Sequence, residues 1–515
     1  MKKKRTDMII LAVLLVLALL IVFQSVHSEK PPTSSPVSID VKSYDGKPLG
    51  VIPGGQYEAV TNQCFPNSTI VYLTGIPELY TALLTKKIDG FTISEICLRQ
   101  MQRQNPNVVW LPEVLSTRYR YFGFAKTEKG ETLRAQMDAM LQEFEADGTM
   151  AQLEEIWYGD NEALKQVDSS GLTGENGTLH LGVNATDEPY NYMRDGEIVG
   201  FNIDIVMRFA RRYGYNITYT ETEPQGLFMG LKAGKFDMLA TAISYSDERA
   251  QSVYFSRPAM KFDVVLAVRA EDAGITDIRK PGFFESVIDS FQKTFIRESR
   301  WKMIAAGVGT TCLMTCLSVI LGTVLAFAIC LFRRTDSRLS NPISNLYVKV
   351  LQGTPMVVLL MIMYYVVFGN SGLAAIWVAV IGFSLHFGAY ISEALRSGIN
   401  SVNAGQREAA LALGYTENQA FFHFILPQAI DHILPVYRGE VISLLKGTAV
   451  AGYISVQDLT KMGDLIRSRT YEAFFPLVST AVIYFILAWI IGLMLDKGMA
   501  QIDPRRRRHN ESAEN

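Results

Sequence analysis

Five long hydrophobic segments in the C-terminal half of the chain restrict its fold more than any other feature. They run over residues 303–332, 345–368, 373–392, 429–455 and 473–497. Apolar runs of about 20 residues match the thickness of a bilayer. With 49% hydrophobic and only 19% charged residues, the composition suits a protein divided between water and lipid. We therefore expect residues 302–503 to form an all-α membrane domain of five core helices.

Positive charge gathers near both ends of the sequence. The run Lys2-Lys3-Lys4-Arg5 precedes an apolar stretch at 8–23, and four arginines at 505–508 follow the last hydrophobic segment. Basic residues beside membrane spans mark the cytoplasmic side. We expect 1–28 to be a membrane anchor or a signal, with an uncleaved anchor favoured and both termini then cytoplasmic. The net charge of -2 argues against a general nucleic-acid binder.

Residues 38–272 have the pattern of a soluble α/β domain. Short β-rich runs such as 69–73 and 264–268 alternate with amphipathic helical stretches. The segments Leu79 to Asp89 and Leu227 to Asp237 share Leu, Leu, Lys and Asp at equal offsets. This internal repeat predicts two similar lobes, at 37–165 and 179–272, each with the same helix-then-strand unit.

An amphipathic connector at 273–301 joins these lobes to the hydrophobic segments. Its apolar residues recur at helical spacing, so we expect a helix that lies on the outer membrane surface.

Five cysteines show no spacing typical of a metal site or a disulfide framework. We predict no metal site, and we expect that Cys64 and Cys97, both outside the membrane, do not pair.

A polar, helix-forming stretch at 393–427 interrupts the hydrophobic segments. It contains Glu408-Ala409-Ala410, then Gly414, then Leu426-Pro427. This spacing resembles the EAA loop of ABC importer permeases, a cytoplasmic helix-turn-helix that docks on the ATPase subunit. Phe424 departs from the pattern, which usually has Ile there. Gly414 permits the turn between the helices because glycine accepts a positive φ. The predicted docking residues are Glu408, Ala409, Ala410, Gly414, Leu426 and Pro427.

The soluble part resembles polar amino-acid binding proteins, the family 3 solute-binding proteins. Residues 179–256, with Pro189-Tyr190 and Ser246-Asp247-Glu248-Arg249, resemble the first lobe of that family, and residues 46–159 resemble the second lobe. The lobes stand in reversed order, as in a circular permutation. The resemblance implies a two-lobed, periplasmic-binding-protein-like clamp, circularly permuted, ahead of the permease domain. A decayed pair of lobes that no longer binds ligand is the alternative.

The resemblance assigns the carboxylate side of a ligand site to the lobe at 179–272. Arg249 matches the carboxylate-binding arginine of the family, and its planar guanidinium suits bidentate binding. Ser244 and Thr241 match positions that supply hydroxyl or backbone contacts.

The ammonium side of the site departs from the family pattern. Asn184 and Ser94 stand where relatives usually carry aspartates, and Asp187 and Glu95 are acidic residues close by that can substitute. The Gly-Thr-Thr turn of the family is replaced by a turn that ends at Gln56. These departures leave the identity of the ligand open.

The sequence contains no Gly-x-x-x-x-Gly-Lys-Ser/Thr loop, so we expect a separate subunit to hydrolyse ATP. The resemblance implies a transport subunit rather than an enzyme. It would capture a polar amino acid, or a similar small carboxylate, outside the cell of a bacterium. The implied partners are ABC ATPase subunits, a second permease copy in a homodimer, the ligand and membrane lipid, and no cofactor is implied in this chain.

Two other classes of protein remain as alternatives. A ligand-gated channel needs a filter such as Thr-Val-Gly-Tyr-Gly, which the sequence lacks, and it does not explain the stretch at 408–427. A membrane sensor with a solute-binding ectodomain predicts a long cytoplasmic signalling domain, whereas a short polar tail follows Arg508.

Overall fold

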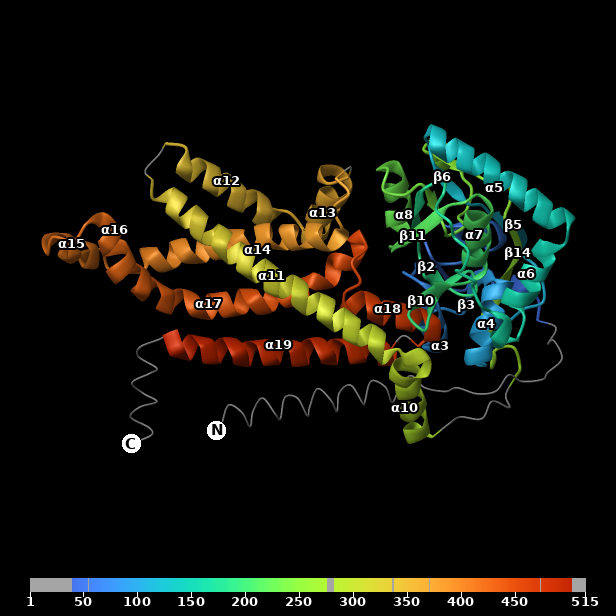
Figure 1. Cartoon of the computed structure of the whole chain (residues 1–515). Helices are drawn as coiled ribbons and strands as arrows, with labels where there is room; N and C mark the ends of the chain where they lie inside the picture. Colours follow the sequence, from blue (N-terminus) through green and yellow to red (C-terminus); the bar gives the residue numbers. More distant parts are fainter. Residues whose placement is uncertain are drawn as a thin grey trace. The chain divides into compact units, whose positions relative to one another are not determined.

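The computed structural model describes residues 39–502, apart from residues 54, 276–281, 336–337, 370 and 473. Its chain divides into two compact units (Figure 1). One unit comprises residues up to 305 together with 462–480, and the other comprises 306–461 and the residues after 480. The anchor or signal predicted at 1–28 lies outside the described residues.

The first unit contains a six-stranded mixed sheet. Its order is β2-β1-β3-β14-β4, with β5 also paired to β14. The strands are β1 (Leu49–Val51), β2 (Ile70–Tyr72), β3 (Gly90–Ser94), β4 (Val108–Trp110), β5 (Ser116–Arg120) and β14 (Met260–Arg269). All five residues of β3 are buried, as expected for a central strand covered on both faces. The β-strands predicted around 69–73 and 264–268 are confirmed.

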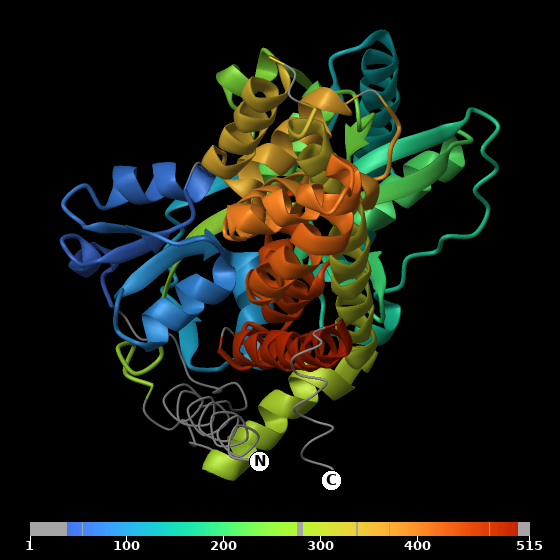
Figure 2. The ribbon, with the colours of Figure 1, turned by 90° about the vertical axis from the view of Figure 1, so that its left-hand side faces the viewer.

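A second, five-stranded sheet in the same unit has the order β11-β7-β12-β6-β13. Its strands are β6 (Gly123–Ala125), β7 (Thr178–Val183), β11 (Asn216–Glu221), β12 (Met238–Leu239) and β13 (Val253–Phe255). A three-stranded antiparallel meander, β8 (Thr186–Asp187), β9 (Asn191–Arg194) and β10 (Glu197–Val199), follows β7. In Figure 2 the blue elements of the first sheet stand apart from the green elements of the second.

The two halves of the internal repeat fall on different sheets. The first copy is α3 (Ile76–Leu84) followed by β3, and the second is α8 (Pro224–Lys232) followed by β12. The prediction of one helix-then-strand unit in each lobe is therefore confirmed. From here on we number the lobes in chain order, so that the first lobe is the part that resembles the second lobe of the family. The first lobe is the first sheet with α2 (Gln56–Cys64), α3 and α4 (Glu95–Gln104). The second lobe is the second sheet with the meander, α5 (Glu128–Ala146), α6 (Thr149–Tyr158), α7 (Phe201–Arg212), α8 and α9 (Asp247–Ala250).

The two sheets do not follow the boundary predicted between 165 and 179. Strand β6 and helices α5 and α6 come before that boundary in sequence, but they belong with the second sheet. Strand β14 comes after the boundary, but it pairs within the first sheet. This unit also contains α10 (Phe283–Phe291) and residues 462–470 of α18 (Leu459–Thr470).

The second unit is helical. Its helices are α11 (Trp301–Arg333), α12 (Ser340–Gly353), α13 (Met356–Met361), α14 (Ala375–Asn400), α15 (Ala404–Ala412), α16 (Glu417–Ala420), α17 (Leu426–Gly447) and α19 (Phe474–Ile502). Three helices are long and apolar enough to cross a membrane, α11, α14 and the 474–499 part of α19, and the bent pair 340–353 and 356–367 adds a fourth candidate. The described part of the chain thus contains several candidate membrane spans.

Two predicted spans differ in the structure. The single helix expected at 345–368 is wrong, because the chain bends by 107° between α12 and α13. Thr354 is extended there and Pro355 follows it, as expected where proline removes a backbone donor and disfavours the helical region for the residue before it. The span expected at 429–455 corresponds to α17. By composition α17 is not among the candidate membrane spans, because it contains several charged residues, including Arg438 and Glu440.

Candidate functional site

The seam between the two lobes is closed by an ion pair. Arg120, the last residue of β5, places Nη1 2.5 Å from Oδ2 of Asp187 in β8. The side chains are 12% and 21% exposed. Burial lowers the pKa of Arg120 and the Asp187 carboxylate raises it, and the carboxylate prevails, so the pKa lies well above its ordinary value. Asp187, predicted as a ligand residue, is therefore held by the opposite lobe.

Ser94 reaches the same seam from the end of β3. Its hydroxyl lies 3.2 Å from the Tyr190 hydroxyl, which the second lobe provides. Cys97, in the first turn of α4, has its Sγ 3.4 Å from Oδ1 of Asp187. Burial, reinforced by Asp187, raises the pKa of the Cys97 thiol well above its ordinary value. Cys64 and Cys97 are free thiols, as expected.

Asn184 and Thr241 lie together within the second lobe. The backbone N–H of Asn184 donates to Thr241 Oγ1 at 2.8 Å, and the side-chain Nδ2 of Asn184 donates to the Thr222 carbonyl at 3.0 Å. Thr186 donates to Asn184 Oδ1 at 2.5 Å. These bonds fix the loop that leads from β7 into the meander, and hence the position of Asp187.

Arg249 and Ser244 form a second local group. Arg249 Nη1 donates to the Ser244 carbonyl at 3.2 Å, and the guanidinium stacks 4.6 Å from the centre of the Phe228 ring. Burial lowers the pKa of Arg249, and Glu248 opposes that effect. Arg249 and Ser244, both predicted to bind the carboxylate of a ligand, thus interact with each other in the structure.

The remaining two candidates interact within the first lobe. Gln56 Nε2 donates to the Tyr119 carbonyl at 2.9 Å, which ties the start of α2 to the strand that carries Arg120. Glu95 accepts a 3.1 Å hydrogen bond from Arg99 Nε, one turn along α4.

The sequence reasoning did not select Arg120, Tyr57 or Tyr158. Arg120 alternates with Arg118 along β5, and β6, which joins the second sheet, begins three residues later at Gly123. An arginine at the end of a strand just before the chain changes lobes was a usable signal. Tyr57 and Tyr158 carried none, because aromatic residues in helices are usually core residues.

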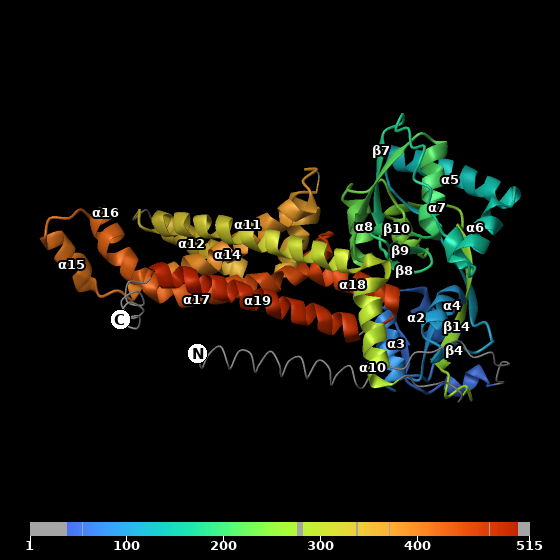
Figure 3. The same cartoon turned by 60° about the horizontal axis from the view of Figure 1, so that its bottom comes forward.

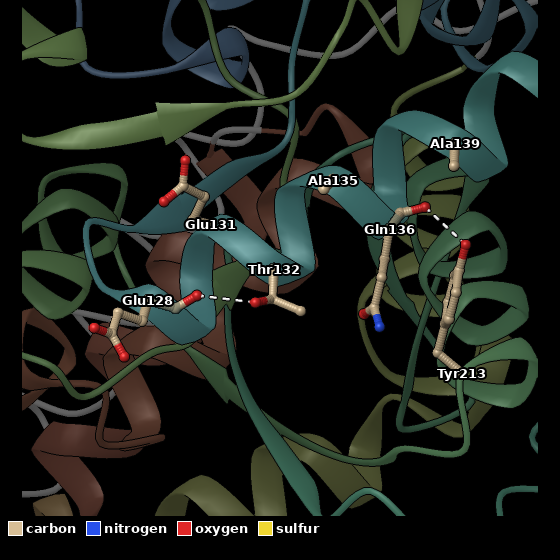
Figure 4. Close-up of a pocket in the computed structure, with 7 residues that line it drawn as sticks. All are labelled: Glu128, Glu131, Thr132, Ala135, Gln136, Ala139 and Tyr213. Atoms are coloured by element: carbon tan, nitrogen blue, oxygen red, sulfur yellow. Dashed lines mark hydrogen bonds between the residues drawn. The ribbon is translucent and has the colours of Figure 1, made fainter.

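A shallow hollow on the second lobe lies away from these candidates. It is lined by Glu128, Glu131, Thr132, Ala135, Gln136, Ala139 and Tyr213 (Figure 4). The Tyr213 hydroxyl donates to the Gln136 carbonyl at 3.0 Å across it. None of the predicted ligand residues lines this hollow, so it gives no support to a ligand site.

The 462–480 part of the first unit contacts both lobes. Arg467 pairs with Glu78 of the first lobe, and Arg469 pairs with Glu188 of the second. Arg469 Nη2 also lies 2.8 Å from Oε1 of Glu298. Glu188 and Arg469 have side chains only 4% and 9% exposed, so this pair is shielded from water. Glu188 directly follows Asp187 in sequence.

In the second unit, the predicted docking loop is a helical hairpin of α15 and α16. It lies at one end of that unit (Figures 1 and 3). Gly414 has φ of 87°, which confirms the predicted turn. Thr416 and Gln419 form a capping box that starts α16, and Arg407 Nε donates to Glu417 Oε2 at 3.0 Å across the hairpin.

The hairpin exposes both polar and apolar side chains. Glu408 and Ala409 are exposed, whereas Ala410 is buried and anchors the hairpin. Leu413 is 76% exposed beside Gly414, and Phe422 is 44% exposed. The sequence reasoning missed Leu413, although its place next to a predicted glycine turn was a signal. Pro427 is exposed and Leu426 half-buried at the start of α17.

Helix α10, which lies in the predicted connector, exposes apolar side chains and buries polar ones. Its apolar residues Phe284 and Ile288 are 78% and 57% exposed, whereas its polar residues Ser286 and Ser290 are buried. In water this arrangement is unfavourable, because apolar area is left in contact with solvent.

The chain is similar in sequence to two groups of known proteins. The family model for bacterial extracellular solute-binding proteins, family 3, matches residues 179–417. The putative glutamine transport system permease protein GlnP of Rickettsia conorii is 31% identical over 213 residues, which is 41% of this chain and 94% of the relative. The L-cystine transport system permease protein TcyB of Bacillus subtilis is 34% identical over 201 residues, 39% of this chain and 86% of the relative.

Among solved structures, that of an amino acid ABC transporter with histidines shares 32% identity over 39% of this chain and 94% of its own, with a TM-score of 0.36. The helical unit and the two-sheet unit define the membrane subunit of a transporter with an attached binding domain. The chain belongs to the amino-acid ABC transporter permeases and carries a fused solute-binding domain. Such permeases are transport subunits, not enzymes, and work with ATPase partners.

Proposed function

We propose that this chain captures a polar amino acid in its clamp and delivers it to a transmembrane pathway formed by two copies of its helical unit. The observation that carries the proposal is the presence, in one chain, of a two-lobed binding unit and a permease unit. The relatives named for glutamine and cystine support an amino acid as cargo. Fusion keeps the clamp at high effective concentration near the pathway, of order mM for a short linker.

We place the clamp outside the cell and the α15–α16 hairpin in the cytoplasm. Helix α10 supports this sidedness. Its exposed apolar face suits an interfacial position in the outer leaflet, next to the start of α11. Since α10 follows the clamp and α11 is a candidate span, the chain would leave the clamp, lie along the membrane surface and then cross it.

The α15–α16 hairpin is the proposed docking site for the ATPase subunit. Leu413 and Phe422 offer exposed apolar side chains, and Glu408 adds an exposed charge on α15. An exposed patch of this kind, rimmed by polar residues, is typical of a protein interface. ATP-driven closure of the ATPase dimer would move the hairpin and, through the continuous chain, α14 and α17.

We also propose that the clamp arose by circular permutation. The exchange of β6 and β14 between the sheets supports this origin, because two strands connect lobes that are otherwise built from separate stretches. Permutation is tolerated where chain ends are exposed, as at the polar linker around 168–178.

A reconstitution experiment tests the function. The full chain would be purified with its ATPase subunit and placed in proteoliposomes, and uptake of radiolabelled L-glutamine, L-arginine and L-cystine would be measured with and without ATP. We expect ATP-dependent uptake of at least one of the three. Ion currents without ATPase would instead favour a ligand-gated channel, and uptake of none of the three would contradict an amino-acid importer of this range.

A further inference from the structure

The division between the two compact units falls inside three helices. The boundary after residue 305 lies within α11, the boundary after 461 within α18 and the boundary after 480 within α19. A flexible linker behaves as a random coil, whereas a helix is a semi-rigid connection. The clamp is therefore joined to the helical unit by helices at all three of these places.

Residues 462–480 lie between two of these boundaries and belong to the unit that contains the clamp. Met462 and Leu465 of α18 are buried in one apolar cluster with Ala185 and Met193 of the second lobe. The second lobe and α18 thus share a small hydrophobic core.

Arg469, on the same helix, adds a buried charge to this contact. It pairs with Glu188 of the second lobe, and the two side chains are 9% and 4% exposed. Its guanidinium also lies 4.7 Å from the centre of the Tyr192 ring, and its Nη2 lies 2.8 Å from Oε1 of Glu298. Loss of one partner from a buried ion pair is strongly unfavourable, because the other charge is left without compensation. The contact between α18 and the second lobe is therefore costly to break.

Tyr471 extends this contact beyond the end of α18. Its side chain is 2% exposed and lies in the buried cluster that contains residues of both lobes. Burial raises the pKa of Tyr471 well above its ordinary value, and the Glu188 carboxylate is the main charge that adds to the rise. The segment thus places one aromatic side chain inside the clamp, near the same carboxylate that Arg469 binds.

The contact of α18 with the first lobe is weaker. Arg467 pairs with Glu78 of α3, and these side chains are 15% and 27% exposed, so water reaches the pair. Arg467 Nη1 also lies 2.8 Å from Oδ1 of Asp464, within α18 itself. Ion pairs that water reaches contribute little to stability, and Asp464 stays with Arg467 when Glu78 leaves. The first lobe can therefore leave α18 at a small cost in free energy.

We propose that residues 462–480 are a permanent mount for the clamp. Helix α18 keeps the second lobe joined to the helical unit throughout transport, and the first lobe is the one that leaves α18 and returns to it. The inference rests on the proposed function and deepens it, because it names the lobe that moves and the contact that changes, Arg467 with Glu78. Movement of the first lobe then reaches the helical unit through α18, without release of the clamp.

Cleavage of the chain tests the mount without any substitution in it. Protease sites are inserted before Ile39 and before the exposed Gly282, and the full chain carries an affinity tag after residue 515. We expect the fragment 39–281, which contains both lobes, to stay with the tagged part after cleavage and washing in detergent. Release of this fragment from the wild type would overturn the inference.

Two arginine variants show which lobe holds the fragment. In Arg469→Gln the carboxylate of Glu188 is buried without its partner only while the second lobe is bound, so the fragment should dissociate at least about 10-fold faster than in the wild type. Arg467→Gln is the matched control, two residues away on the same helix. Water reaches its partner Glu78, so dissociation should stay within about threefold of the wild type. Equal effects of the two variants would overturn the assignment of the second lobe as the fixed one.

A cross-link on the first lobe tests which lobe moves. In a background without the five native cysteines, the variant E78C/R467C is treated with a short bismaleimide, which ties α3 to α18. We expect loss of ATP-dependent uptake of radiolabelled L-glutamine, L-arginine and L-cystine in proteoliposomes, relative to the same variant treated with N-ethylmaleimide. D464C/R467C is the matched control, because its cross-link lies within α18 and should leave uptake equal to that of its N-ethylmaleimide-treated form. Unchanged uptake by cross-linked E78C/R467C would overturn the inference.

The two kinds of measurement separate the inference from the proposed function. Retention of the fragment is measured without transport, so its release would overturn the mount while the importer function stands. Absence of ATP-dependent uptake by the wild type would contradict the proposed function itself, and the assignment of the moving lobe would fall with it.

Discussion

The indole Nε1 of Trp157 donates a 3.0 Å hydrogen bond to Oδ2 of Asp204, and both side chains are buried. The bond joins α6 to α7 across 47 residues of sequence. It therefore binds a helix that precedes the polar linker to a helix that follows it, inside one lobe.

Trp157→Phe keeps an aromatic ring but removes this donor. We expect the free energy of local opening of α6 and α7 to fall by about 1–3 kcal/mol, because a buried carboxylate oxygen loses its partner. Hydrogen exchange of the detergent-solubilised full chain measures that free energy. Arg208 binds the other oxygen of the same carboxylate at 2.8 Å with a side chain 40% exposed, so Arg208→Gln should cost less than about 1 kcal/mol. Equal effects of the two changes would contradict a structural role for the indole bond.

Gly414→Pro should uncouple ATP hydrolysis from transport while ligand binding persists. Proline holds φ near -65°, whereas Gly414 has φ of 87°, so the α15–α16 turn cannot form. ATPase activity and amino-acid uptake would be compared in proteoliposomes. Gly439→Ala is the control, since Gly439 lies inside α17 with room for a Cβ. If the Gly414→Pro variant takes up as much amino acid per ATP hydrolysed as the wild type, docking through this hairpin would be contradicted.

The exposed apolar face of α10 should lie in lipid. Spin labels attached at 284 and 288, in a background without other cysteines, are expected to be accessible to oxygen and shielded from a water-soluble nickel reagent. Glu285 is exposed next to that face, and a label there should remain accessible to nickel. Equal nickel accessibility at all three positions would show that α10 is covered by water and not by the membrane.

Cys97 should react slowly with alkylating reagents in the folded protein. The thiolate is the reactive form, and burial together with Asp187 holds the pKa of Cys97 well above 9.0, so less thiolate is present at any given pH. At pH 8 a variant retaining only Cys97 should react at least about tenfold more slowly than one retaining only Cys64. Its rate should still be rising above pH 9.0. Similar rates in the folded protein, with similar rates after denaturation, would contradict a closed seam.

Local patterns were sufficient for several elements. The helix-then-strand repeat, the turn at Gly414 and the apolar spans α11, α14 and α19 follow from periodicity, glycine and hydropathy, which depend on neighbours in sequence. The bend at Thr354-Pro355 was also encoded locally, but the hydrophobic run on both sides concealed it.

The candidate site was predicted less completely, and for a physical reason. Asp187, Ser94, Asn184 and Thr241 could be named because each lies at, or close to, a position that the resemblance to family 3 solute-binding proteins assigns to the ligand site. Arg120 could not be paired with Asp187, since that contact depends on which lobe each strand joins. Trp157 could not be paired with Asp204 either, since their contact depends on α6 packing in the same lobe as α7.

The sequence by itself determined that this chain combines an α/β unit with several candidate membrane spans and a polar hairpin, because hydrophobic length and period record the environment of each segment. Only the tertiary structure decided that β6 and β14 change sheets and that Arg120 closes on Asp187. Contacts between distant segments arise from packing of whole elements, and no local pattern of residues specifies them.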